Sequence, residues 1–120
     1  PIYPYKDKLV SLSNGSKPVV CYDQNTGNIV WQQNFSAKEI ENFNFSFDDS
    51  KVFKNYLFST QCDYLLVLNL EDGSVVYNKD ITLPSACLQL GLDINEEKRL
   101  MYIQDRFRIN CYKLPDEIKF

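Results

Sequence analysis

Acidic side chains that could do chemistry stand as neighbouring pairs at three places in this 120-residue sequence: Asp48-Asp49, Glu71-Asp72 and Glu96-Glu97. Paired carboxylates can act as general acid and base, and carboxylate oxygens bind calcium. A general acid needs burial to raise its pKa, whereas each of these pairs stands in an expected hairpin turn that faces water. We therefore predict solvated turns and no catalytic residue, so the protein is not expected to be an enzyme.

Metal and cofactor sites are disfavoured by residues that are missing. The segment beginning at Asp93 starts like an EF-hand calcium loop, but Lys98 replaces the glycine and Gln104 the glutamate that such a loop needs. Histidine is absent, which excludes Ser-His and Cys-His catalysis and His-ligated metals. The four glycines are scattered and form no phosphate-binding loop. We expect no metal and no cofactor.

Thiol chemistry is the next possibility, because the sequence contains four cysteines: Cys21, Cys62, Cys87 and Cys111. No two of them have the CxxC spacing of a redox or zinc site. All except Cys62 lie in apolar, strand-like runs, where a free cysteine behaves as a small buried hydrophobe. We therefore expect four core or near-core thiols in a reducing compartment, the cytoplasm or the nucleus.

Three glycosylation sequons, at Asn14, Asn34 and Asn44, favour the alternative compartment, a secretory lumen. No signal peptide stands at the start of the sequence, and the first residue is Pro1 and not Met. We therefore expect a processed product or an excised segment of a longer chain.

The overall composition is that of an ordinary globular domain, with 44% hydrophobic and 24% charged residues. Apolar runs such as Leu65–Leu68 are far too short for a membrane span. The formal net charge of -3 argues against binding nucleic acid through bulk charge. Basic and aromatic residues between Lys98 and Lys113 leave one alternative open, a small β domain that binds single-stranded nucleic acid.

Short apolar runs separated by turn residues predict an all-β chain, and an aromatic content of 14% supports it. Only Ser36–Glu41 could form a turn of helix. Turns are expected at Asn14-Gly15, Gln24–Gly27, Asp48–Lys51 and Glu71–Ser74. About ten strands are predicted: Lys8–Leu12, Pro18–Asp23, Ile29–Phe35, Asn42–Phe47, Val52–Ser59, Tyr64–Leu70, Val75–Ile81, Ala86–Ile94, Leu100–Asp105 and Phe107–Leu114.

The strand pattern recurs along the chain. Residues 18–31 align with residues 64–77, so that Gly27 coincides with Gly73 and Trp31 with Tyr77. A third copy begins near Ile109, about 44 residues further on. Self-similarity at a period of about 45 residues is typical of repeat proteins.

The third strand of each unit is apolar on both sides, as in Val19–Tyr22 and Leu65–Leu68. Such a strand must be covered on both faces, which a single antiparallel meander cannot do. Stacking meanders around a shared axis gives each sheet two neighbours, as in β-propellers. Gly27 and Gly73 stand where the hairpin turn needs a positive φ.

The chain resembles the β-propeller repeat families, and its period is similar to that of the WD40 repeat. The family's Trp-Asp dipeptide would fall on Tyr22-Asp23, Leu68-Asn69 and Tyr112-Lys113. Only Asp23 keeps the acidic member, and no Gly-His precedes any unit.

The first unit is also similar to the quinoprotein-type propeller repeat. That pattern carries Asp, then Thr-Gly, then Trp, which stand here as Asp23, Thr26, Gly27 and Trp31. The second unit departs from it, with Asn69 in place of the Asp.

We therefore predict one all-β domain over residues 1–120, built as antiparallel four-stranded meanders that stack as blades of a partial β-propeller. Repeat units are expected at about 9–35, 42–81 and 86–114. Fewer than three blades fit, whereas known propellers close with four or more, so missing sequence or another chain is expected to complete the ring. A two-sheet β-sandwich is the structural alternative.

Trp31 could stack on a bound quinone or hold two neighbouring sheets together. Tyr77 repeats at the same position, and a cofactor contact would not recur in every unit, so we predict the structural role. Cys21 and Cys111 also occupy equivalent positions, but two units apart, which is too far for a disulfide.

The resemblance to WD40 proteins implies a non-catalytic protein–protein interaction scaffold in a multi-subunit complex, whose partners bind loops on one face of the ring. These loops join the second and third strands of each unit, or join successive units. The residues expected to bind the partner are Lys17, Lys38, Glu39, Gln61, Asp63 and Arg106. A fragment of a quinoprotein-like dehydrogenase or lumenal sensor is the rival function.

Overall fold

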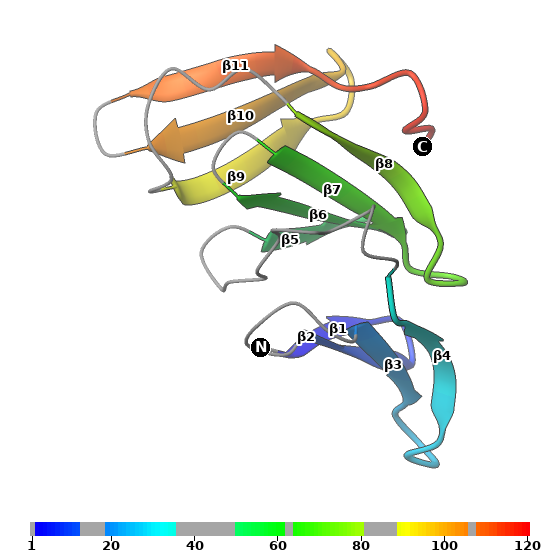
Figure 1. Cartoon of the computed structure of the whole chain (residues 1–120). Helices are drawn as coiled ribbons and strands as arrows, with labels where there is room; N and C mark the ends of the chain where they lie inside the picture. The colour runs from blue at the N-terminus through cyan, green and yellow to red at the C-terminus, as the bar shows by residue number, and fades with distance from the viewer. Residues whose placement is uncertain (1, 13–18, 36–49, 62–63, 81–88, 106–107) are drawn as a thin grey trace.

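Three antiparallel β-sheets follow one another along the chain (Figure 1). This computed structural model describes residues 2–12, 19–35, 50–61, 64–80, 89–105 and 108–120. Those residues form eleven strands and no helix. They therefore contain no helix with the length and apolar character that a bilayer crossing requires.

Each sheet is a meander in which every strand pairs with the next one along the chain. The first sheet contains β1 (Ile2–Tyr5), β2 (Lys8–Leu12), β3 (Val19–Asp23) and β4 (Ile29–Gln33). The second contains β5 (Ser50–Phe53), β6 (Tyr56–Gln61), β7 (Tyr64–Asn69) and β8 (Val75–Asp80). The third contains β9 (Gln89–Asn95), β10 (Leu100–Asp105) and β11 (Ile109–Lys113). The predicted all-β class and antiparallel meanders are confirmed, although the third sheet has three strands within the described residues.

β1 is absent from the predicted strands. It pairs with β2 over four residues, from Ile2 opposite Ser11 to Tyr5 opposite Lys8. Pro4 argues against a strand when the sequence is read alone, because proline cannot donate to a neighbouring strand. An edge strand such as β1 has a neighbour on one side only and so tolerates it.

The prediction of a single strand over Val52–Ser59 is wrong. A two-residue loop at Lys54-Asn55 divides it into β5 and β6. Such a short loop leaves the apolar pattern of the sequence almost uninterrupted, so it is hidden from a pattern-based prediction. Ser50-Lys51, expected in a turn, belong to β5. The predicted strand Asn42–Phe47 and helical turn Ser36–Glu41 lie outside the described residues.

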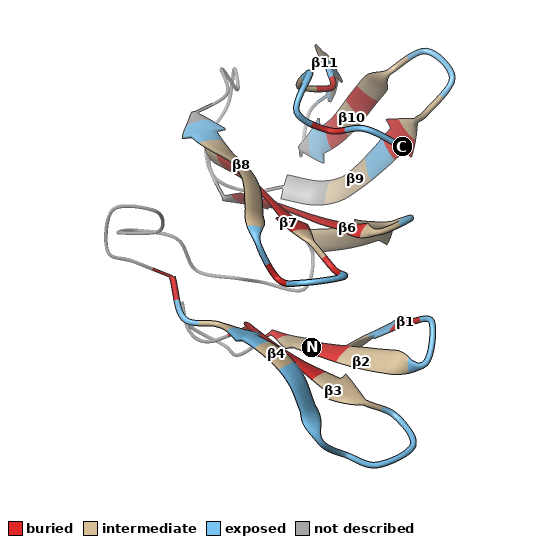
Figure 2. Ribbon diagram, turned by 90° about the vertical axis from the view of Figure 1, so that its right-hand side faces the viewer, coloured by how far each residue is buried: buried red, intermediate tan, exposed pale blue. Residues whose placement is uncertain are grey.

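The middle sheet is packed on both faces. In β7, Leu65 and Val67 belong to the hydrophobic cluster shared with the third sheet. Leu66 and Leu68, which alternate with them, belong to the cluster shared with the first sheet. All four side chains are at most 1% exposed. Figure 2 shows the result as three stacked layers, one more than the predicted alternative of a two-sheet sandwich.

The strand pairing of the first sheet recurs in the second, 46 residues later. Cys21 lies opposite Trp31 and Tyr22 opposite Ile29, so β4 carries one extra residue there, a β-bulge. Val67 lies opposite Tyr77 and Leu68 opposite Val75, so β8 carries the same β-bulge. A bulge re-aims the strand that carries it, so its recurrence gives β4 and β8 the same course in their sheets.

The turns after β3 and β7 are equivalent as well. The amide N–H of Gly27 donates to the carbonyl of Asp23 at 2.8 Å, and that of Gly73 to the carbonyl of Asn69 at 2.7 Å. The glycine φ angles are 76° and 77°, which confirms the predicted positive φ. The sequence repeat is therefore a repeat of backbone geometry.

Leu65 and Ile109 occupy equivalent positions, but Leu65 is fully buried and Ile109 is 67% exposed. We expect Leu65→Ala to lower the free energy of unfolding by about 2–5 kcal/mol, because it leaves a cavity between two sheets. Ile109→Ala should cost less than about 1 kcal/mol, mainly strand propensity. Urea unfolding followed by far-UV circular dichroism measures both, and equal losses would show that the middle sheet is not enclosed.

Candidate functional site

The residues predicted to bind a partner fall almost entirely outside the part of the chain that the structure describes. Gln61 is the last residue of β6, and its side chain is not described. The remaining five lie outside the described residues: Lys17, Lys38, Glu39, Asp63 and Arg106.

The strands that lead to these positions share one direction. The second strand of each sheet, β2, β6 and β10, points toward the same end of the molecule (Figure 1). The connections that follow them in the sequence contain Lys17, Asp63 and Arg106. The fold therefore brings the starts of these three connections to a common end of the molecule, although they are more than 40 residues apart in the sequence.

The opposite end is joined by ion pairs between neighbouring sheets. Lys6, in the β1–β2 loop, lies 2.6 Å from Glu71 in the β7–β8 turn. Lys54, in the β5–β6 loop, lies 2.5 Å from Glu96 in the β9–β10 turn. Both lysines have a φ of 53° and occupy the first position of their loops. Each pair thus links one sheet to the next along the chain.

Tyr5 adds a partly buried hydrogen bond to the contact between Lys6 and Glu71. Its hydroxyl donates to the Glu71 carboxylate oxygen that also accepts a hydrogen bond from Lys6. Burial, and then the hydrogen bond to Glu71, raise the pKa of Tyr5. The hydrogen bonds from Lys6 and Tyr5 lower the pKa of Glu71. The phenol is therefore neutral and the carboxylate ionised at neutral pH, as both hydrogen bonds require. We call this contact of Tyr5, Lys6 and Glu71 the clamp.

Trp31 holds the first and second sheets together, as predicted from its recurrence as Tyr77. Its indole Nε1–H donates to the carbonyl of Leu70 at 3.0 Å. The ring lies so close to Gly73 that a Cβ added there would be 2.4 Å from Cε3. Gln33, two residues further along β4, donates to the carbonyl of Gly73 at 2.8 Å. The sequence prediction missed Gln33, because nothing in its pattern distinguishes it from a solvated strand residue.

The last residues of the chain close the joint between the second and third sheets. Ile118 is fully buried in the cluster that these sheets share. The Arg99 guanidinium donates to the carbonyls of Pro115 and Ile118 at 2.9 and 2.7 Å. Tyr56 donates to the carbonyl of Lys119 at 2.7 Å. No repeat pattern extends beyond Leu114, so the sequence offered no sign of this contact.

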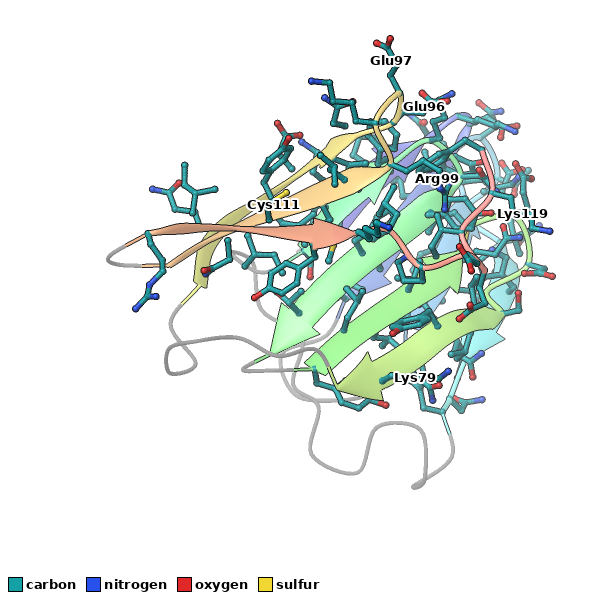
Figure 3. All side chains as sticks on the ribbon, turned by 90° about the horizontal axis from the view of Figure 1, so that it is seen from above. Lys79, Glu96, Glu97, Arg99, Cys111 and Lys119 are labelled. Carbon is teal, nitrogen blue, oxygen red and sulfur yellow. The ribbon has the colours of Figure 1, made fainter. Side chains whose placement is uncertain are left out.

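The expectation of four core thiols is correct for Cys21 and wrong for Cys111. Cys21 is fully buried, and desolvation raises the pKa of its thiol. Cys111 is exposed on β11, in the upper sheet of Figure 3. Both thiols are free. Their positions in the repeat are equivalent, but no described sheet covers the outer face of β11. Cys62 and Cys87 lie outside the described residues.

Two carboxylates, Asp93 in β9 and Asp72 in the β7–β8 turn, accept hydrogen bonds that favour their charged form. Lys51 lies 3.0 Å from Asp93 and lowers its pKa. Hydrogen bonds from Ser74 lower the pKa of Asp72. Glu97 projects from the tip of the β9–β10 turn (Figure 3). A general acid needs a raised pKa, whereas the pKa values of Asp72 and Asp93 are lowered. The described residues contain no group of three side chains able to hold a metal ion.

A hollow of about 470 Å³ lies on the outer face of the third sheet, beside β5. The ion pair between Lys51 and Asp93 contributes to its wall. Each charge already has its partner, so the hollow offers a ligand mainly the ring of Tyr102 and the exposed side chain of Ile109. Among the described residues, no other sheet covers this face, so the hollow is open rather than enclosed.

No protein-family model matches the sequence, and no curated protein is similar to it. Among solved structures, the chain is similar to the computationally designed Ika4 protein, with a TM-score of 0.61 and 13% sequence identity. The similarity covers 95% of this chain and 64% of that one, so this chain spans just under two thirds of its length. At this identity the similarity concerns the fold alone. The class defined so far is an all-β protein of three stacked antiparallel sheets.

Alanine substitutions at the two equivalent glycines, Gly27 and Gly73, distinguish the effect of the contact with Trp31 from the effect of backbone strain. Both positions have a positive φ, so both variants carry a similar strain. Only at Gly73 would the new Cβ collide with the indole. We expect Gly73→Ala to lower the free energy of unfolding by about 1–3 kcal/mol more than Gly27→Ala. Urea unfolding followed by emission of the single tryptophan measures the difference, and equal losses would contradict the contact.

The clamp around Glu71 predicts the pH dependence of stability. A lowered folded pKa gives a contribution that is present above the unfolded pKa and lost as the pH falls through the folded pKa. The stability of the wild type and of Glu71→Gln should therefore converge in acid. Because the folded pKa of Tyr5 is raised, its contribution is lost as the pH rises through that value, and Tyr5→Phe should flatten this alkaline limb.

Thermal unfolding across pH measures both limbs of this profile. Glu97→Gln is the matched control, because it makes the same change in net charge at a hairpin tip that Figure 3 shows pointing into solvent. An acid limb that Glu71→Gln and Glu97→Gln change equally would argue against the clamp.

Proposed function

We propose that this protein is a non-catalytic protein–protein interaction scaffold whose three sheets are successive blades of a WD40-like β-propeller. The observation that carries the proposal is the middle sheet, β5–β8, packed on both faces by meanders of the same kind. A propeller blade has a neighbour on each side, whereas a sheet of a sandwich has one. Three blades are fewer than a closed ring needs, so further sequence or a second chain completes it in this proposal.

The quinoprotein-like residues of the first unit have structural contacts that favour the scaffold over the dehydrogenase. Asp23 accepts hydrogen bonds from two amide N–H groups of its own turn, at 2.8 and 3.0 Å. The Thr26 hydroxyl accepts another, from the amide of Asn28, at 3.2 Å. Gly27 supplies the positive φ, and Trp31 docks on the next sheet. All four residues therefore stabilise the turn or the contact between the first two sheets. Their quinoprotein-like spacing is explained by these contacts without a bound quinone.

The end of the molecule toward which β2, β6 and β10 point is the proposed partner-binding face. The opposite end is occupied by ion pairs and by the C-terminal residues, which join the sheets to one another. Loops carried by a rigid frame suit recognition. A free, buried Cys21 is in keeping with a reducing compartment, and we propose the cytoplasm or the nucleus as the location.

Affinity capture with the full chain tests the proposed face. A loop variant carries alanine at the six proposed positions: Lys17, Lys38, Glu39, Gln61, Asp63 and Arg106. We expect proteins bound stoichiometrically by the wild type to be lost by this variant, because charged rim residues guide association and contribute specific contacts. Quantitative mass spectrometry of the bound fraction measures the loss.

A control variant carries alanine at Asp7, Glu97 and Lys98, which are exposed at the opposite end. It should retain the same proteins, and circular dichroism should show the same fold for all three chains. Equal loss in both variants, or no stoichiometric partner for the wild type, would contradict the proposed face. A visible absorption band of a bound quinone in the purified chain would favour the rival function.

A further inference from the structure

The outer strand of the first sheet, β4, has an open edge. It pairs with β3 on one side, and no strand of the described residues lies beside it on the other. Figure 2 shows much of β4 exposed, and the side chains of Ile29 and Val30 are 57% and 44% exposed. An edge strand directs a row of backbone N–H and C=O groups outward, where another strand can pair with them.

β4 lacks the residues with which proteins usually protect such an edge. Charged residues and proline on an edge strand discourage pairing. Every other edge strand of the described sheets contains one of them: Pro4 in β1, Lys51 in β5, Lys79 in β8, Asp93 in β9 and Lys113 in β11. β4, with the sequence Ile-Val-Trp-Gln-Gln, contains neither kind. Propellers leave only short, protected edges, so this edge does not follow from the proposed fold.

Side chains on the inner face of β4 hold the strand in place. The indole N–H of Trp31 donates to the carbonyl of Leu70 at 3.0 Å, and the Gln33 amide donates to the carbonyl of Gly73 at 2.8 Å. Both contacts are made with the second sheet. The edge is therefore formed before any partner arrives, which lowers the cost of ordering it on binding.

The backbone of Gln32 faces this open edge. Along β3, successive residues direct their backbone groups to alternate sides. The N–H of Asp23 donates to the carbonyl of Asn28, and its carbonyl accepts from the N–H of Gly27, both at 2.8 Å. Asp23 therefore faces the β4 side, and Val20, three residues earlier, faces β2. Gln32 lies opposite Val20, so its N–H and carbonyl point away from β3.

We propose that two copies of this chain pair antiparallel through β4, about a two-fold axis at Gln32. The Gln32 N–H of each copy donates to the Gln32 carbonyl of the other, and Trp31 of one copy lies opposite Gln33 of the other. The two first sheets then form one continuous sheet. The proposal goes beyond the loop-binding scaffold, uses another surface, and stands independently of it.

The chemistry of β4 favours a second copy as the occupant. Like charges directly opposite each other destabilise a strand pair, and a strand without charge avoids this cost when it meets itself. The two-fold axis brings the Gln32 side chain beside an identical amide, and an amide can both donate and accept a hydrogen bond. One edge thus supplies both halves of a self-complementary interface.

Sedimentation velocity of the full chain, from about 10 μM to about 1 mM, tests the proposal. We expect a monomer–dimer equilibrium with a Kd on the order of 100 μM, because a single strand pair buries less surface than a stable interface. Nuclear magnetic resonance of the 15N-labelled chain should show concentration-dependent shifts centred on the Gln32 amide.

Opposite charges at the axis identify the pairing. Gln32→Lys and Gln32→Glu should each weaken self-association by about fivefold or more, because each places like charges opposite each other. An equimolar mixture of the two variants should associate at least as tightly as the wild type. Asn78→Lys is the matched control, because Asn78 holds the equivalent position on β8 and gains the same charge. It should associate like the wild type.

Two results would overturn the proposal through these variants: self-association that Gln32→Lys leaves unchanged, and a mixture that associates no better than either variant alone. A chain that stays monomeric at every concentration would also overturn it, and would leave the edge to another polypeptide or to further sequence of this protein. Circular dichroism should show the same fold for all four chains.

Discussion

Strand β7 is apolar on both faces, so both faces must be shielded from water, and the rest of the structure depends on this constraint. Leu65 and Val67 point to one side and Leu66 and Leu68 to the other, and all four are buried. Burying an aliphatic side chain contributes about 1.5–3 kcal/mol relative to leaving it exposed. No single antiparallel meander can enclose its own third strand on both faces. A sheet is therefore needed above and below β5–β8, and the chain supplies one from each side.

The joints between these sheets have a consistent direction. At each joint a hairpin lysine of the earlier sheet reaches an acidic residue of the later one, as in Lys6 with Glu71 and Lys54 with Glu96. At the first joint Trp31 of the outer strand docks on the turn of the following sheet. Exposed ion pairs contribute little stability, so their main effect is to fix how sheets are aligned. In the three ion pairs between the described sheets the lysine belongs to the earlier sheet and the carboxylate to the later one, so the two faces of a sheet carry different charges at these joints.

Pattern reading recovered the features that depend on local chemistry. The all-β class, the meanders, the positive φ of Gly27 and Gly73 and the joint made by Trp31 all follow from alternation, turn residues and recurrence. Features that depend on distant partners were missed. Gln33 gains its role only because the Gly73 carbonyl lies 2.8 Å away, and Ile118 is buried only because two sheets meet above it. Of the six expected partner-binding residues, Gln61 ends β6 and the other five lie outside the described residues.

The sequence alone determined that sheets must stack, because β-strands that are apolar on both sides leave no other way to exclude water. It also determined the unit that repeats, since turn glycines and aromatic residues recur with the strands. Only the tertiary structure decided which equivalent positions are covered. Cys21 and Cys111 have the same place in the repeat, yet one is buried and the other exposed. Gly73 carries an indole and Gly27 does not. Whether a residue is buried depends on which sheet packs against it. A repeated sequence specifies the surface of each sheet but not which other sheet covers that surface.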